Sequence, residues 1–509
     1  MYTDTRASMS GDLTFTQAIV KGLAPGGGLL VPRSIPSMEL DEILELASLP
    51  YAQRAARIYK LFDIDVDDET IDELMSRAYG TNFDDEAITP IATVAPGMHV
   101  MELWHGPTSA FKDMALQCLP LFFSDAVKRL RKTGEATEDY LILVATSGDT
   151  GKAALEGFRD RDHTSIMVFY PNGGVSDIQF KQMATQLGGN VYVLGGRGDF
   201  DDCQTSVKRT FNDTAFNDRL KAERNIRLSS ANSINWGRLM PQIVYYISAY
   251  AELATSGAVE PGKPIDICVP TGNFGNILGA YYAKRIGTPI ERLVCASNDN
   301  RVLTDFIGSG VYDIRDRKLV LTPSPSMDIL VSSNLERQLF ELTDRDGELV
   351  RSWMESLMSE GCFEVDAQTH ERVAELYAAG SATNEESLAT IRRVLSEHGY
   401  LMDPHTAVAW KVASENKGDN PMLVVSTAHW AKFGYDVYRA IKGLPAGSAL
   451  PEDVAGLTGV ELNRQIASMT GIDNIPAGLD ALDDMELRFT GVCDATCEGV
   501  EKAVEELLG

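Results

Sequence analysis

From about residue 140 the chain alternates between short apolar runs and longer stretches whose apolar residues recur every three or four positions. Short apolar runs that end in Gly, Asn, Ser or Thr are typical of buried strands, and the periodic stretches are typical of helices that cover a sheet. The pattern predicts an α/β fold with open, mostly parallel sheets flanked by helices. The predicted strands are residues 140–144, 165–169, 191–194, 265–269, 293–296 and 422–425.

The segments around this region have other patterns. The first part of the chain holds two predicted helices and a glycine-rich link, which indicates an α-rich N-terminal unit. We predict five parts: N-terminal unit 1–97, α/β core of two lobes 98–310, mostly helical excursion 311–419, return to the core 420–442, and C-terminal segment 443–509, which ends in a helix from Glu498 to Leu508.

Composition limits the possible partners. The 509 residues are 44% apolar and carry a formal net charge of −27, which disfavours binding to nucleic acid or to an anionic membrane. No apolar run approaches the length of a membrane span, and no signal-peptide core follows Met1. Seven cysteines and seven histidines show no metal-ligand spacing. We therefore expect a cytoplasmic protein without a catalytic metal, in which an anionic substrate needs a local basic pocket.

The most informative segment is 105–113, which sets Lys112 in the first turn of a predicted helix. Thr108 or Ser109 is predicted to cap that helix. The positive helix end and burial both lower the pKa of an ammonium, so Lys112 is a candidate nucleophile that can form a Schiff base. A helical lysine is more often solvated, so this interpretation needs support from the rest of the chain.

Three loops that follow predicted strands supply candidate binding groups. Residues 270–279 form a glycine-bearing turn before a helix, which suits a phosphate, although a structural turn also uses glycine. Residues 145–152 fail the nucleotide P-loop pattern at Thr146 and Ala153; their hydroxyls suit a carboxylate, or only cap a helix. In 426–433, Thr427 offers a neutral hydrogen bond to a heterocycle, or is an ordinary turn hydroxyl.

Two further segments suit an anionic substrate. Residues 233–238 open a helix in which Arg238 is able to clamp a phosphate with two hydrogen bonds, although a helical arginine is often solvated. Residues 324–328 form a second polar segment near the end of the sheet.

Together these motifs resemble the threonine synthase family of pyridoxal-phosphate (PLP) enzymes, which are of fold type II and related to tryptophan synthase β. The resemblance spans nearly the whole chain. Trp430 stands where the family usually has proline. The matching motifs are residues 21–29, 105–113, 146–151, 232–238, 271–276, 324–328, 331–334 and 427–433.

The resemblance implies a PLP cofactor between the two lobes, bound covalently to Lys112. It places Thr427 at the pyridine nitrogen, with Phe111 and Asp149 near the ring. The implied phosphate-binding residues are Gly272, Asn273, Phe274, Gly275 and Asn276.

The implied reaction converts O-phospho-L-homoserine and water to L-threonine and phosphate by γ-elimination and β-addition, as the last step of threonine biosynthesis. The family resemblance also favours a monomer or a weak homodimer. The implied substrate-binding residues are Thr146, Ser147 and Thr150 for the α-carboxylate, and Asn235, Arg238 and Ser326 for the phosphate.

Two alternatives stay open. Another type-II PLP lyase, such as a hydroxyamino-acid dehydratase or a phosphothreonine lyase, would share most of these motifs. A catalytically silent PLP-binding protein would share the fold, although the intact Lys112 disfavours it.

Overall fold

The computed structural model describes residues 1–508, which build two open sheets flanked by helices. One sheet has six strands, parallel except for its antiparallel β3–β4 edge, and the other has five parallel strands. All six predicted strands are present. The larger sheet runs β13 (Tyr377–Ser381), β10 (Ile290–Ser297), β9 (Ile265–Pro270), β14 (Met422–Ser426), β4 (Met98–Glu102), β3 (Ile91–Ala95); the smaller runs β15 (Val492–Asp494), β7 (Val191–Arg197), β6 (Thr164–Pro171), β5 (Asp139–Ala145), β8 (Ile226–Ser229).

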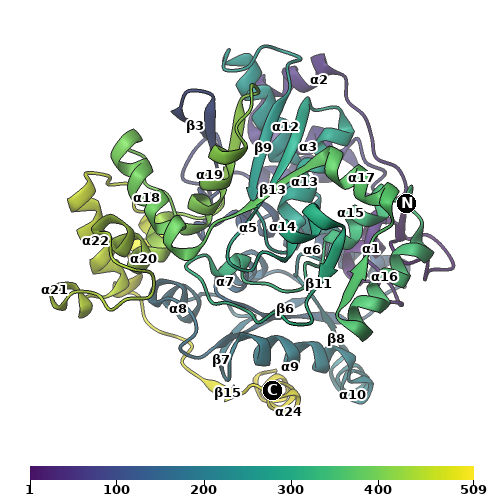
Figure 1. Cartoon of the computed structure of the whole chain (residues 1–509). Helices are drawn as coiled ribbons and strands as arrows, with labels where there is room; N and C mark the ends of the chain where they lie inside the picture. Colours follow the sequence, from purple (N-terminus) through teal and green to yellow (C-terminus); the bar gives the residue numbers. More distant parts are fainter. Residues whose placement is uncertain (509) are drawn as a thin grey trace.

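Helices cover both sheets, which explains why an inner strand such as β9 is buried throughout. In Figure 1 the six-stranded sheet lies in the upper half and the five-stranded sheet in the lower half, with the short helix α5 (Lys112–Leu116) and α7 (Asp149–Phe158) between them. The helices around the larger sheet include α12 (Pro241–Thr255), α13 (Gly275–Ile286), α14 (Val302–Ser309) and α19 (Pro404–Asn416); those around the smaller include α8 (Asp177–Ala184), α9 (Phe200–Asn212) and α10 (Thr214–Arg224).

The N-terminal region has four helices where the sequence predicted two. The extra helices are short, and α2 has only six residues, so their periodicity gives little signal. This region also forms a small antiparallel pair of strands and shares one hydrophobic core with α12. The elements are β1 (Tyr2–Asp4), α1 (Phe15–Lys21), β2 (Leu30–Pro32), α2 (Leu40–Glu45), α3 (Tyr51–Tyr59) and α4 (Asp68–Ala78).

Residues 311–419 hold mostly helices, but they also contain β13, which returns to the larger sheet beside β10. The run Tyr377–Ser381 is short and contains no β-branched residue, so it does not stand out as a strand. The other elements are β11 (Val311–Asp313), α15 (Leu335–Leu342), α16 (Gly347–Glu360), β12 (Cys362–Glu364), α17 (Ala367–Leu376) and α18 (Asn384–His398).

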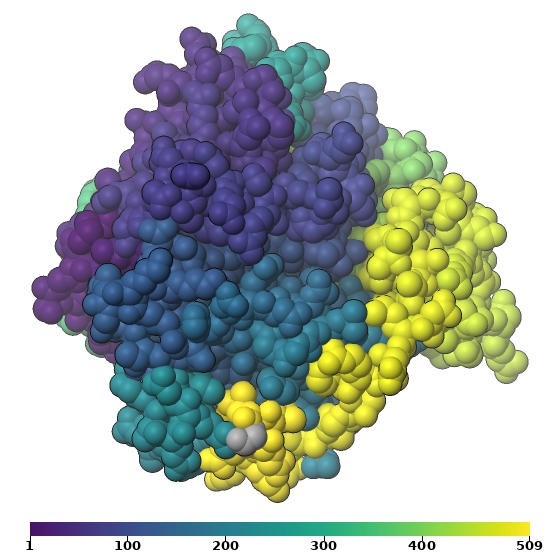
Figure 2. All heavy atoms as spheres, turned by 180° about the vertical axis from the view of Figure 1, so that it is seen from behind, coloured from purple at the N-terminus to yellow at the C-terminus, as the bar shows by residue number. Residues whose placement is uncertain are grey.

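The C-terminal segment contacts helices of both sheets. Here α22 (Gly459–Thr470) lies against α20 (Gly434–Lys442) and α8, and β15 adds to the five-stranded sheet. The predicted terminal helix is confirmed as α24 (Cys497–Leu507), which packs on α9. Figure 2 shows this segment in yellow along the right side and the lower edge, with the N-terminal region in purple above. Within residues 1–508, no helix combines the length and the apolar character needed to cross a membrane.

Candidate active site

Loops from both sheets meet at Lys112, the first residue of α5. The Lys112 Nζ lies 3.1 Å from the Ser326 Oγ and 3.5 Å from a carboxylate oxygen of Asp149, which begins α7 after β5. The backbone N–H of Phe111 donates to the Thr427 carbonyl, 2.8 Å away, just after β14. The structure therefore brings together five of the predicted site residues, from segments as far apart in sequence as 111 and 427.

The Lys112 amine has the properties of a nucleophile. Its side chain is buried, and burial, aided by the charges of Arg238 and Lys432, outweighs the attraction of Asp149 and lowers its pKa to about 8. A larger fraction of the amine is therefore neutral near pH 7 than for a solvated lysine. The sequence predicted this direction from the same cause.

The turn before Lys112 is built differently from the prediction. Neither Thr108 nor Ser109 caps α5; the predicted cap is wrong. Instead the N–H and hydroxyl of Thr108 donate to the carboxylate of Asp113, over 2.8 and 2.7 Å. A Cβ at Gly106 would lie 2.5 Å from the Asp113 side chain, so the turn closes only with glycine there. The carboxylate that follows Lys112 thus holds the turn that precedes it.

Asp149 is an ionised carboxylate in a buried position. Its Oδ1 accepts from Lys432 and from Gln179, both over 2.9 Å, and its Oδ2 faces Lys112 and the Ser326 hydroxyl, which is 3.4 Å away. Burial alone would raise the pKa of Asp149, but the two ammonium groups hold it well below the usual range. Lys432 was not a predicted site residue, because its partner lies in a loop far away in sequence.

The glycine-bearing loop after β9 leads into α13 and presents a helix N-terminus. The carbonyls of Gly272 and Asn273 are held by the Ser332 hydroxyl and by Asn334, over 2.8 and 3.0 Å. A Cβ at Gly272 would lie only 2.8 Å from the Ser326 carbonyl. The loop therefore passes the backbone at Ser326 so closely that position 272 has room only for glycine.

The same loop has the donors that a phosphate needs. Phe274 adopts φ +60° just before the helix, which turns the chain into α13 at Gly275. The side-chain N–H groups of Asn276 have no hydrogen-bond partner within residues 1–508, although its Oδ1 accepts from Tyr245 and Tyr246. An unpaired buried donor at a helix N-terminus fits the phosphate group of PLP.

Arg238, in the short helix α11 (Trp236–Leu239), is a buried cation without a carboxylate partner in the described part of the chain. One of its nitrogens donates to the Ala231 carbonyl over 2.8 Å, and another lies 3.5 Å from the Thr150 hydroxyl. Burial lowers its pKa to about 10. A buried guanidinium is costly unless an anion accompanies it, which favours an anionic ligand here.

The other predicted substrate residues have different surroundings. The Thr146 hydroxyl accepts from the N–H groups of Gly148 and Gly151, over 3.0 and 2.8 Å, and so shapes the start of α7. Ser147 and Thr150 are partly exposed beside it. Asn235 is fully buried; its amide donates to the Ile19 carbonyl and accepts from Gly237, so it caps α11. The structure does not bring the Asn235 side chain to Lys112.

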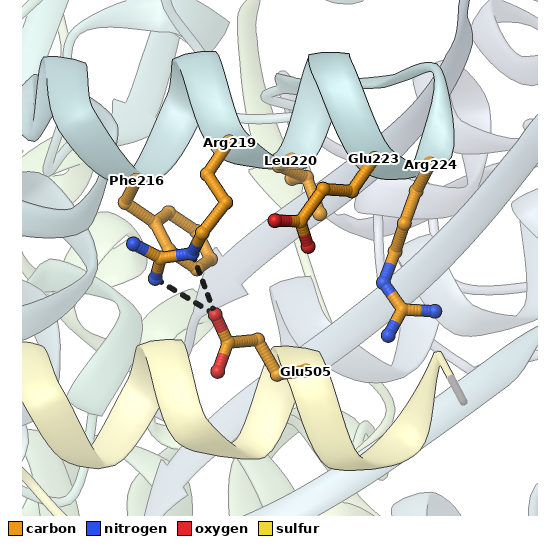
Figure 3. Close-up of a pocket in the computed structure, with 6 residues that line it drawn as sticks. All are labelled: Phe216, Arg219, Leu220, Glu223, Arg224 and Glu505. Atoms are coloured by element: carbon orange, nitrogen blue, oxygen red, sulfur yellow. Dashed lines mark hydrogen bonds and ion pairs between the residues drawn. The ribbon is translucent and has the colours of Figure 1, made fainter.

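A surface hollow of about 470 Å³ lies between α10 and α24, as Figure 3 shows. Arg219 and Glu505 pair across it at 2.7 Å, and none of the predicted site residues lines it. The hollow is therefore separate from the cluster around Lys112.

The chain has a two-sheet fold, a buried lysine between the sheets, and a glycine-bearing loop before α13 that suits a phosphate. These features define it as a PLP-dependent enzyme of fold type II. Residues 92–427 match the family described as "Pyridoxal-phosphate dependent enzyme", residues 1–79 match "Threonine synthase N terminus", and residues 406–504 match "Threonine synthase, C-terminal". The chain belongs to the threonine synthase family.

Known proteins resemble the chain along most of its length. It is 42% identical to "Threonine synthase-like 1" of Homo sapiens over 84% of this chain, and it spans 58% of that protein's length. It is 38% identical to the threonine synthase of Pseudomonas aeruginosa, over 90% of this chain and 93% of that protein. The PLP-bound threonine synthase of Brucella melitensis superposes with a TM-score of 0.84 at 38% identity, covering 99% of this chain and 98% of that one. The expected fold, family and cofactor are confirmed.

Proposed function

We propose that the chain is a carbon–oxygen lyase that converts O-phospho-L-homoserine and water to L-threonine and phosphate, the last step of threonine biosynthesis. The observation that carries this proposal is the buried Lys112 amine beside Asp149, with the unpaired cation Arg238 close enough to affect its pKa. The first two groups suit proton transfer at an amino acid, and the third suits a substrate phosphate.

The proposed cofactor contacts follow from the same cluster. Gly272 to Asn276 would hold the PLP phosphate at the start of α13, and the Thr427 hydroxyl would face the pyridine nitrogen. Phe111 and Asp149 would lie beside the ring, since both flank the Lys112 amine. When bound, PLP withdraws electrons from the substrate α-carbon and makes its proton acidic.

The chain's own groups then handle protons and charge. The Lys112 amine would take the proton from Cα and move protons at Cβ and Cγ. The Ser326 hydroxyl, 3.1 Å from the Lys112 Nζ and 3.4 Å from Asp149, is placed to hold the amine in position between transfers. Closure of the two lobes would exclude water until phosphate has left.

Substrate contacts are proposed at the start of α7 and around α11. Thr146, Ser147 and Thr150 would hold the α-carboxylate at a helix N-terminus. Arg238 would bind the phosphate, with Ser326 from the facing loop. Asn235 would act indirectly, since its side chain fixes the first turn of α11.

A substrate without phosphate would leave Arg238 buried and unpaired, which disfavours a hydroxyamino-acid dehydratase. We further propose a cytoplasmic monomer or weak homodimer that binds neither nucleic acid nor membrane. The net charge of −27 and the seven free cysteines support this setting.

The test is product analysis of the PLP-loaded protein with O-phospho-L-homoserine. We expect threonine and phosphate in equal amounts, and a loss of about 10³-fold or more in rate for Lys112→Ala, which keeps the site but lacks the amine. Phosphothreonine and threonine are the comparison substrates. Release of ammonia without threonine would identify one of the alternative lyases, and no product from any substrate would support the silent PLP-binding protein.

A further inference from the structure

Lys432 is a fully buried lysine with two specific partners. It lies in the short helix η3 (Trp430–Phe433) after β14, and its side chain is 0% exposed. Its Nζ donates to the Thr108 carbonyl over 2.8 Å and pairs with the Asp149 Oδ1 at 2.9 Å. Burying an ammonium is costly unless it is paired, so these contacts fix where the side chain lies.

Lys432 and its two partners come from three separate elements. Thr108 belongs to the turn before α5, which carries Lys112. Asp149 begins α7, which follows β5 of the five-stranded sheet, whereas Lys432 itself follows a strand of the six-stranded sheet. One ammonium group therefore links the two lobes to the turn that positions the cofactor lysine.

The contacts divide the two oxygens of Asp149 between two tasks. Lys432 and Gln179 occupy Oδ1, so Oδ2 is left to face Lys112 and the Ser326 hydroxyl. Without Lys432, the carboxylate would keep only Lys112 as a cationic neighbour in direct contact. It would then pair fully with Lys112.

We propose that Lys432 is a positioning residue, which holds Asp149 by its Oδ1 and directs its Oδ2 toward Lys112. The Asp149–Lys432 pair then acts as one electrically neutral unit beside the Lys112 nitrogen. This inference rests on the proposed role of Lys112 in holding the cofactor, and it adds a residue that acts through Asp149 rather than on the substrate.

The charges around the site make the proposal measurable. Asp149 of α7, Arg238 of α11 and Lys432 of η3 all act on the Lys112 nitrogen, and His405 of α19 acts on Asp149. Lys432 and Arg238 lower the pKa of Lys112, whereas Asp149 raises it. Removal of Lys432 should therefore raise the pKa of the Lys112 nitrogen, and removal of Asp149 should lower it.

The experiment compares Lys432→Met, Asp149→Asn and the double variant with the unchanged protein, each loaded with PLP. The cofactor absorbance is titrated against pH without substrate, which reports protonation of the nitrogen that joins Lys112 to PLP. We expect the apparent pKa to rise by about one unit or more in Lys432→Met, to fall by a similar amount in Asp149→Asn, and to return close to the original value in the double variant.

Lys152 supplies the matched control. It is a largely buried lysine on α7 that pairs with Glu156 at 3.4 Å and with Gln186, not with Asp149. Lys152→Met should leave the titration curve unchanged. An unchanged curve in Lys432→Met, or a double variant that keeps the shift of Lys432→Met, would overturn the proposal.

If Lys432→Met does not fold, Asp149→Asn and the double variant decide the question, since replacing both members of a buried pair is often tolerated. Identical curves for these two would also overturn the proposal. Because no substrate is present, opposite shifts in a protein that makes no threonine would contradict the proposed function and keep this inference. Threonine formation without these pKa shifts would contradict this inference and support the proposed function.

Discussion

Two buried arginines, Arg238 and Arg337, lack a carboxylate partner in the part of the chain that the structure describes. Arg337 donates hydrogen bonds to the carbonyls of Leu30 and Ile234 and to the side chain of Asn334. Through Asn334 it links β2 to the loop that leads into α13. Arg238 has fewer contacts and adjoins Thr150. The sequence singled out Arg238 from its motif but gave no sign of Arg337, since its partners are backbone atoms brought together only by folding.

Arg238→Met should weaken substrate binding specifically. Loss of charge-assisted hydrogen bonds to a phosphate costs about 1.5–3 kcal/mol each, so we expect KM for O-phospho-L-homoserine to rise by roughly 10- to 100-fold. The affinity for PLP should stay unchanged. Arg219→Met, which removes an exposed arginine paired with Glu505, is the control and should leave KM unchanged. An unaltered KM in Arg238→Met would rule out the phosphate contact.

His105 should make stability depend on pH. Its ring lies 2.6 Å from Asp84 and 3.0 Å from Glu102; burial lowers its pKa, but the two carboxylates outweigh this and raise it to about 9. A raised folded-state pKa stabilises the protein fully below the unfolded value near 6.5, and this contribution is lost as pH rises through 9. Denaturant unfolding of His105→Gln should show a larger loss of stability at pH 6 than at pH 10. Equal losses at both values would contradict the pairing.

Local signals predicted the strands and several helix starts, because these depend on neighbouring residues. The sequence Ser176-Asp177-Ile178-Gln179 has the residues of a capping box, which starts α8 in the structure, and β5, β9 and β14 coincide with the apolar runs. The helix after Lys112 was less predictable. It ends at Leu116, and α6 (Leu119–Thr133) begins anew with Pro120 in its first turn, where proline has no N–H to continue a preceding helix.

The packing of α7 on α5 depends on Gly157. A Cβ there would lie 1.9 Å from the Leu116 carbonyl, so Gly157→Ala must push α7 away from α5. We expect a loss of roughly 1–3 kcal/mol in unfolding free energy and a weaker affinity for PLP, since α5 carries Lys112 and α7 carries Asp149. Both are measured by denaturant titration and by cofactor absorbance.

Gly308 in α14 is the matched helical control, because nothing lies within 4 Å of its Cβ position. Gly308→Ala should be neutral or stabilising by up to about 1 kcal/mol. If Gly157→Ala behaved in the same way, the close crossing of α5 and α7 would not be needed for the site.

The five-part division of the chain stays a prediction, and the described structure shows how closely the parts are joined. The boundary at residue 97 falls between β3 and β4, which pair antiparallel. Phe15 of α1 and Tyr59 of α3 both pack on Phe122 of α6. Such contacts between distant segments have no local signature, which is why the sequence indicated the N-terminal unit as a region but not its place in the core.

Phe15→Ala tests whether the N-terminal region unfolds with the rest. Phe15 is 1% exposed, and removing a buried phenylalanine side chain costs about 3–5 kcal/mol. We expect circular dichroism and cofactor absorbance to show one shared transition, shifted to lower denaturant. The control is Met358→Ala, because this side chain is 81% exposed; it should leave the midpoint of the unfolding transition unchanged. Early loss of one signal would indicate that the N-terminal region folds independently.

The C-terminal segment clasps the molecule from outside. Asp483 pairs with Lys181 of α8 at 2.6 Å, and the Trp430 indole, beside the larger sheet, donates to Asn474 over 2.9 Å. The same stretch of chain is thus fastened to both halves of the molecule on one flank. If the two sheets move apart to admit substrate, these contacts make this flank the hinge. We therefore expect the entrance to widen on the opposite side of the molecule.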